Sequence, residues 1–209
     1  MALTTPTWEF PVSRLARFLC LATVAFCVAS PPTSAAPAKK LDNTLGALWT
    51  TVLETPSAQN PFGTGGAAFA CLDLGGTVAP FAPGGVESCT VKPGTKIFVA
   101  ASSVECSTFE GNGTTEPELR DCARRSDVQV APTVTVDGRS VAVAEVETRL
   151  LNIVLPAGNI FELPARTRGL SVGHGWVAAL HPLTPGTHTI VIHTGASTIT
   201  TTIVVQPGG

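Results

Sequence analysis

The C-terminal stretch of residues 171–205 alternates apolar with polar side chains at a period of two residues. Segments 189–193 and 199–205 alternate Ile and Val with Thr, which is typical of half-buried β-strands, and segment 176–180 is apolar on both faces. Pro185 and Gly186 supply the fixed φ and the positive φ of a type II turn between the first two strands. The stretch therefore predicts three successive antiparallel strands, a β-meander.

The remainder of the chain has the composition of a β-protein. Glycine and proline account for 20 and 17 of the 209 residues, and only 13% of residues are charged. Further segments with strand patterns are residues 88–92, 96–101, 128–136, 140–145 and 147–155. The first two are expected to pair as a hairpin, and so are the next two, which Asp137-Gly138 joins. We predict an all-β fold, a β-sandwich of roughly nine strands with two short peripheral helices.

Both helices are predicted from local signals. In segment 41–54 an apolar face recurs at i, i+3, i+4 and i+7, with Trp49 as its expected core anchor, and Pro56 prevents continuation. In the polar insert 105–125, Thr115 and Glu118 are spaced as a capping box, which predicts a short helix after them.

The N-terminal residues have the organisation of a secretory signal peptide. Arg14 and Arg17 precede an apolar run at 18–29, and small residues suited to cleavage follow at Ala36 and Ala38. The run is shorter than the ~20 residues that span a bilayer, and an uncleaved anchor is the alternative. We predict that residues 1–38 are a signal peptide and that residues 39–209 form a single β-sandwich domain. This domain is expected to be secreted, extracellular or in the cell envelope, without stable membrane insertion after cleavage.

Removal of the signal peptide would leave four cysteines, Cys71, Cys89, Cys106 and Cys122. An even number in an exported domain predicts two disulfides, although three pairings are possible. Sequential pairing, Cys71 with Cys89 and Cys106 with Cys122, closes two short loops and is our prediction. A zinc site made of all four thiolates is disfavoured because the sequence has no CxxC spacing.

Several function classes are disfavoured by what the sequence lacks. A formal net charge of −2 provides no basic stripe, so no nucleic-acid partner is expected. No Rossmann or P-loop glycine pattern is present, so no cofactor is expected. Residues 169–173 match GxSxG, but no Asp or Glu follows Ser171 to complete a hydrolase triad. The four histidines fall on different strand faces or ends, so neither a metal site nor a catalytic residue is predicted.

A weaker pattern suggests where a ligand could bind. Glu105 and Glu110 flank a cysteine in the polar insert, and loops on a rigid β scaffold commonly carry binding residues. Trp176 suits either core packing or the stacking of a sugar ring, since its indole is amphipathic. We predict a ligand site near Glu105, Glu110, His174 and Trp176.

Two functional hypotheses follow. The first is a secreted or cell-envelope binding or structural module without recognisable catalytic apparatus, whose partner is a glycan or an extracellular protein. The second is an extracellular hydrolase that acts on polysaccharide through carboxylates in the 105–125 insert, in the manner of glycosidases. A flat aromatic surface would favour the first, and a buried carboxylate with a perturbed pKa in a deep cleft would favour the second. The oligomeric state stays open.

A series of short motifs extends over most of the predicted mature chain. The motifs are Cys89-Thr90-Val91, Pro93-Gly94-Thr95-Lys96, Glu105-Cys106-Ser107-Thr108, Val134-Thr135-Val136-Asp137-Gly138 and Gly175-Trp176 followed by Leu180, Pro182-Leu183, Pro185-Gly186 and His188-Thr189-Ile190. In this order they resemble a family of uncharacterised bacterial exported proteins. The resemblance implies a secreted, single-domain, β-rich protein and brings no established activity. The family pattern commonly has an acidic residue where this chain has His174.

Overall fold

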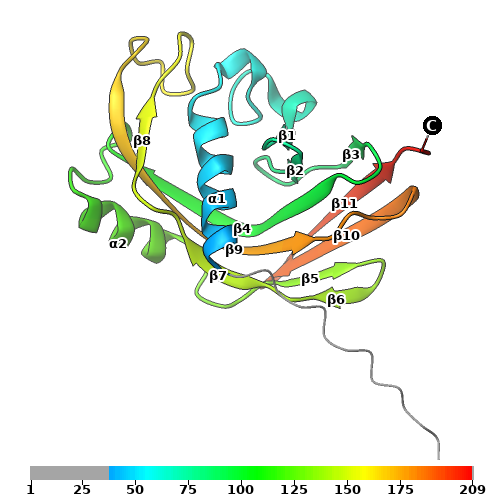
Figure 1. Cartoon of the computed structure of the whole chain (residues 1–209). Coiled ribbons are helices and arrows are strands. Elements are labelled where there is room, and N and C mark those ends of the chain that lie inside the picture. Colours follow the sequence, from blue (N-terminus) through cyan, green and yellow to red (C-terminus); the bar gives the residue numbers. More distant parts are fainter. Residues whose placement is uncertain (1–37, 209) are drawn as a thin grey trace, which may run out of the picture. The chain divides into compact units, whose positions relative to one another are not determined.

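The computed structural model describes residues 38–208, whose strands form two β-sheets (Figure 1). The predicted signal peptide, apart from Ala38, lies outside the described residues. The strands are Cys71–Asp73 (β1), Thr77–Pro80 (β2), Ser88–Val91 (β3), Lys96–Ser107 (β4), Thr133–Val136 (β5), Arg139–Val141 (β6), Ala144–Glu147 (β7), Leu151–Val154 (β8), Arg168–Leu180 (β9), Gly186–Thr194 (β10) and Ser197–Val205 (β11). The fold is therefore mostly β, with eleven strands in place of the roughly nine predicted.

The larger sheet has six strands, in the order β1-β2-β4-β9-β7, with β8 paired to another part of β9. Its long strands β4 and β9 pair antiparallel from Ile97 opposite Leu180 to Ser107 opposite Ser171. The register shifts at a β-bulge between Ala100 and Ser102. The sheet is mixed, because β2 and β4 pair in parallel.

The second sheet has five strands, in the order β3-β11-β10-β5-β6. The predicted β10–β11 hairpin is confirmed, and so is the β5–β6 hairpin at Asp137-Gly138. Two predicted pairings are wrong. Strand β3 pairs in parallel with β11 and makes no hairpin with β4, and β9 belongs to the larger sheet, so the three C-terminal strands are not a meander.

Two α-helices, Ala38–Leu53 (α1) and Glu116–Ser126 (α2), lie near the predicted positions, and two short 3-10 helices, Ser57–Gln59 (η1) and Gly66–Phe69 (η2), follow α1. Helix α1 is not peripheral, because Leu45 and Leu48 are fully buried in a core shared with Phe98 of β4 and Val177 of β9. Helix α2 begins at the predicted capping box of Thr115 and Glu118.

The faces of β9 show how these parts are arranged. The odd-numbered side of β9 faces α1, as the packing of Val177 with that helix shows. On the even-numbered side, Val172 lies in a small core with α2, whereas Ala178 and Leu180 lie in a core with the second sheet. His174 and Trp176, in the middle of this side, lie between the part of β9 that packs against α2 and the part that packs against the second sheet.

Both predicted disulfides are present, with the predicted pairing. Cys71–Cys89 joins β1 of the larger sheet to β3 of the second sheet, and Cys106–Cys122 joins β4 to α2. The second bond therefore holds α2 against the end of β9 on which Val172 lies. Within residues 38–208, neither α-helix combines the length and the apolar character that crossing a membrane requires.

Candidate functional site

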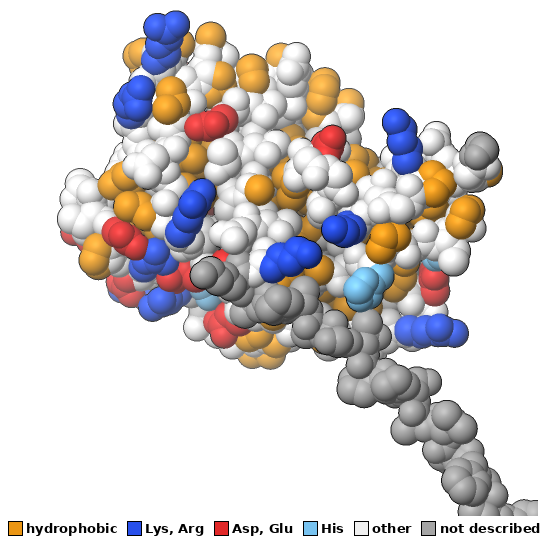
Figure 2. Space-filling model, viewed as in Figure 1, with side chains coloured by type: hydrophobic (Ala, Val, Ile, Leu, Met, Phe, Trp, Pro, Cys, Tyr) orange, Lys and Arg blue, Asp and Glu red, His pale blue; other side chains and the backbone are white. Residues whose placement is uncertain are grey.

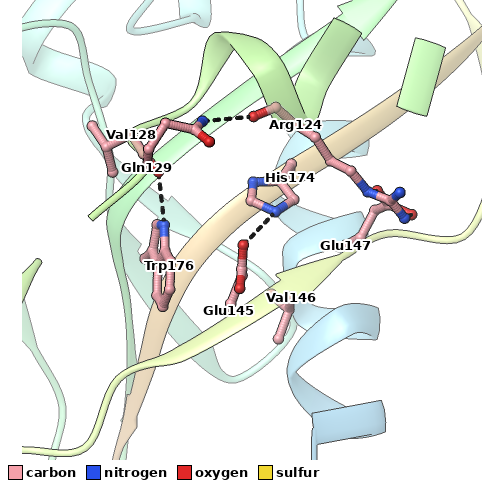
Figure 3. Close-up of a pocket in the computed structure, with 8 residues that line it drawn as sticks. All are labelled: Arg124, Val128, Gln129, Glu145, Val146, Glu147, His174 and Trp176. Atoms are coloured by element: carbon pink, nitrogen blue, oxygen red, sulfur yellow. Dashed lines mark hydrogen bonds and ion pairs between the residues drawn. The ribbon is translucent and has the colours of Figure 1, made fainter. Parts of the chain in front are cut away.

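A groove lies over the middle of β9, beside the end of α2 and strand β7 (Figure 3). Its volume is about 580 Å³. The lining residues come from the end of α2 and the segment after it, from β7 and from β9, and they are Arg124, Val128, Gln129, Glu145, Val146, Glu147, His174 and Trp176. We call this feature the α2–β9 groove.

The pleat of the sheet explains why polar side chains gather here. In the antiparallel pair β7–β9, Glu145 lies opposite Trp176, and Glu147 lies opposite His174. Residues two apart on a strand point to the same face, so these four side chains form one row on the groove side. Val146, between the two glutamates, points to the other face and packs in the core with α1.

A buried carboxylate orients His174. Asp127 is the C-terminal cap residue of α2, and its side chain is 0% exposed. Its Oδ2 lies 2.9 Å from Nδ1 of His174. Its Oδ1 accepts hydrogen bonds from Ser102 Oγ at 2.5 Å and from the backbone N–H of Val128 at 2.7 Å. Because the carboxylate only accepts, Nδ1 of the imidazole carries the proton of this bond.

The other ring nitrogen of His174 faces the groove. Its Nε2 lies 3.2 Å from Oε1 of Glu145, whose side chain is 56% exposed. A dashed line marks this contact in Figure 3. The imidazole itself is 7% exposed. It lies between the buried carboxylate of Asp127 and the exposed carboxylate of Glu145. Both ring nitrogens therefore have carboxylate partners, and the groove reaches solvent at Glu145.

Trp176 forms a second wall of the groove. Its Nε1–H donates to the carbonyl oxygen of Val128 at 3.1 Å, which fixes the indole beside the segment after α2. The residue is half-buried, so part of the indole remains accessible. The ring is thus an aromatic surface whose only hydrogen-bond donor is already used.

Helix α2 is tied to β7 at the far end of the groove. Glu147, 17% exposed, accepts from Arg124 Nε at 2.6 Å and from Nη2 at 3.1 Å, and it also pairs with Arg120. Arg120 in turn pairs with Glu116 one helical turn earlier. These charge-assisted bonds and the Cys106–Cys122 disulfide position Asp127 at the end of α2.

The two glutamates predicted as ligand residues lie elsewhere. Glu105 is directly opposite Gly173, whose position faces Trp49 of α1, so Glu105 lies on the face of the sheet opposite to the groove. Its Oε1 accepts from Ser171 Oγ at 2.5 Å, and Glu110 lies within hydrogen-bonding reach of it. Burial, and then the charge of Glu110, raises the pKa of Glu105 to about 8.

The predicted ligand set therefore separates into two pairs. His174 and Trp176 are brought together in the α2–β9 groove, and Glu105 and Glu110 are brought together on the other face. Three further residues of the site were not predicted from the sequence: Asp127, Glu145 and Glu147. The polar–apolar–polar order of Glu145-Val146-Glu147 was the available signal for a short strand with one polar face.

Figure 2 shows one face of the molecule with the side chains coloured by type. On the face seen in Figure 2, Lys and Arg side chains are scattered among acidic and apolar ones. Among residues 38–208, no group of three or more His, Cys, Asp or Glu side chains is placed to hold a metal ion. The residues matching GxSxG form part of β9, and Ser171 is fully buried there, so they do not form a nucleophile elbow.

Comparisons with known proteins add little to this geometry. No protein-family model and no curated protein sequence matches the chain. Among solved structures, the solution structure of amebosin is similar over 57% of this chain and 88% of that chain, at 11% identity and a TM-score of 0.22. A similarity of this size supports no argument about fold or function.

Proposed function

We propose that this protein is a secreted or cell-envelope binding module with a β-sandwich fold, and that it binds a glycan in the α2–β9 groove. The observation that carries the proposal is the row of Glu145, His174 and Trp176 beside Gln129 in an open groove. Sugar rings present hydroxyl groups at their edges and an apolar face, which suit planar polar side chains and an exposed indole respectively.

Other features support the location and the fold class. Two disulfides are characteristic of proteins from oxidising compartments, and the N-terminal residues have the order of a signal peptide. The cores that connect β4 and β9 with the second sheet are what a sandwich of two sheets requires.

The NMR signals of the tryptophan indole N–H groups can test whether a glycan binds in the groove. The chain has three tryptophans, Trp8, Trp49 and Trp176. Trp49 is 6% exposed and donates to Ser103 on the α1 side, whereas Trp176 lines the groove. We expect neutral, acidic or amino oligosaccharides that bind to shift the Trp176 indole signal in ¹⁵N-labelled protein while the Trp49 signal stays in place.

A matched pair of variants completes the test. Glu145→Gln should weaken the binding of an oligosaccharide that shifts Trp176, and Glu87→Gln should not, since Glu87 is exposed on the segment before β3. If no oligosaccharide shifts Trp176, the glycan proposal is wrong. A shift produced only by an extracellular protein would make that protein the partner instead.

A polysaccharide hydrolase that uses Glu105 and Glu110 is the second candidate, and the raised pKa of Glu105 favours it. Glycosidase carboxyl groups flank a sugar at a separation of roughly 5 Å or more, so these two side chains would have to part to admit a substrate. Release of reducing ends from polysaccharide by the native protein, lost in Glu105→Gln, would support this candidate. Absence of release would exclude it for the polysaccharides assayed.

A further inference from the structure

Three side chains of the groove keep no free hydrogen-bond donor for a ligand. Both nitrogens of His174 already face carboxylates, and Nε1–H of Trp176 donates to Val128. Gln129 uses both hydrogens of its amide, since Nε2 donates to the carbonyl oxygens of Arg124 at 3.0 Å and of Asp127 at 2.8 Å. The donors of these three side chains are therefore occupied within the protein.

Two oxygen atoms remain available. Within residues 38–208, no group bonds to Oε1 of Gln129 or to Oε2 of Glu145. Glu145 is exposed and lies directly opposite Trp176 in the strand register, where Cβ atoms are about 5 Å apart. One ligand group can thus touch the carboxylate and the indole at the same time.

The face of an indole, like a carboxylate, attracts cations. The negative face of the ring quadrupole attracts a cation within about 6 Å, and tryptophan is the best of the aromatic residues for this contact. A ligand hydroxyl has one O–H and can donate to only one of the two oxygen acceptors. An ammonium group can donate to both and also gains from the face of Trp176.

In the described part of the chain, Arg124 is the one Lys or Arg side chain that lines the groove. Its Nε and Nη2 are bonded to Glu147, so its charge is balanced locally, and its side chain is 61% exposed. Within residues 38–208, the charge-bearing partner of the Asp127 and Glu145 carboxylates is the imidazole of His174, which lies between them. Even with the imidazole charged, the two negative charges of Asp127 and Glu145 exceed the one positive charge of His174.

We infer that the α2–β9 groove selects a glycan that carries a protonated primary amine, and thus an oligosaccharide of deacetylated amino sugars. The ammonium group lies between Glu145, Oε1 of Gln129 and the face of Trp176. This inference rests on the proposed function and specifies its ligand. An N-acetyl group on the same sugar removes the charge and adds an acceptor, which faces the acceptors of the groove.

The test compares two tetrasaccharides that differ only in this group, glucosamine tetramer and N-acetylglucosamine tetramer, at a pH where the free amine is protonated. Titrations follow the indole signal of Trp176 in the full chain. We expect the glucosamine tetramer to bind about tenfold more tightly, as one ion pair and one cation–π contact allow. Added salt should weaken its binding and leave the weaker binding of the N-acetyl form unchanged.

Variants identify the contacts. Glu145→Gln should reduce the affinity for the glucosamine tetramer by about fivefold and the affinity for the N-acetyl tetramer by a smaller factor, because the amide still accepts a hydrogen bond. Glu87→Gln is the matched control and should change neither. Equal affinities for the two tetramers, or a preference for the N-acetyl form, would overturn the ammonium inference and leave the glycan proposal standing. If other oligosaccharides shift Trp176 and neither tetramer does, the inference fails alone, and if no oligosaccharide does, both proposals fail.

Discussion

Asp127 and His174 form a buried contact, Oδ2 to Nδ1 at 2.9 Å, between the C-terminal cap of α2 and the middle of β9. Loss of the imidazole would leave a fully buried carboxylate with hydrogen bonds but without its ring partner. We expect His174→Phe to reduce the free energy of unfolding by about 3 kcal/mol. Urea denaturation at neutral pH measures this change.

A second variant of the same contact separates charge from packing. Asp127→Asn keeps an oxygen for Ser102 and for the Val128 N–H, so it should cost less, about 1 kcal/mol. If His174→Phe cost no more than Asp127→Asn, the contact would not stabilise α2 against β9 in the way described.

Gly173 of β9 allows Trp49 to approach the sheet. A Cβ atom at this position would lie 2.5 Å from Cδ1 of Trp49, inside van der Waals contact. Trp49 cannot easily retreat, because its Nε1 donates to Ser103 Oγ, which itself donates to the carbonyl oxygen of His174. We expect Gly173→Ala to reduce the melting temperature, with a loss of about 2 kcal/mol from overpacking.

The control for this prediction is Gly208→Ala, where a Cβ would have no neighbour within 4 Å. A melting temperature of Gly173→Ala equal to that of the control would show that α1 adjusts without cost.

His188 and Asp137 predict a pH-dependent contribution to stability. Hydrogen bonding to Asp137, and then to the carbonyl oxygen of Thr184, raises the pKa of His188 above 6.5. The same bond from His188, followed by the N–H of Thr189, lowers the pKa of Asp137 below 3.8. The histidine contribution is complete below pH 6.5 and is lost as pH rises through its folded pKa, whereas the aspartate contribution is complete above pH 3.8 and is lost as pH falls.

The measurable consequence is a difference between the native chain and His188→Gln. The native chain should be the more stable one between pH 3.8 and 6.5, by less than about 1 kcal/mol because Asp137 is half-exposed, and the difference should shrink above this range. In an Asp137→Asn background the same substitution should produce a weaker pH profile, because only the bond to Thr184 then raises the pKa of His188. A difference that grew with rising pH would contradict the assigned pair.

Features determined by near neighbours in the chain could be predicted from the sequence. The capping box of Thr115 and Glu118, the Asp137-Gly138 hairpin and the anchoring role of Trp49 depend on spacings of a few residues, and all are confirmed. The sequential disulfide pairing was also found, because it closes the shortest loops.

Sheet membership could not be predicted in the same way. The alternation of Ile190 and Ile192 is equally compatible with pairing to β9 or to β5, since a strand's own pattern does not specify its neighbour. The turn at Pro185-Gly186 therefore looked like a hairpin, although it carries the chain from one sheet to the other. For the same reason Asp127 was missed as the partner of His174, 47 residues away, whereas His174 itself was included.

Glu105 leads to the last prediction, a fall in stability with rising pH. Burial, assisted by the charge of Glu110, raises its pKa from 4.5 to about 8 in the folded protein. The folded state thus holds a proton that the unfolded chain has released, so the stabilising contribution is complete below pH 4.5 and is lost progressively as pH rises to 8.

In Glu105→Gln this dependence should be absent, since the amide has no proton to lose and can still accept from Ser171 Oγ and donate to Glu110. Relative to Glu105→Gln, the native chain should lose on the order of 4 kcal/mol between these limits, measured by urea denaturation across the range. Glu87→Gln should follow the native profile, and a native profile parallel to that of Glu105→Gln would mean that Glu105 ionises without cost in the fold.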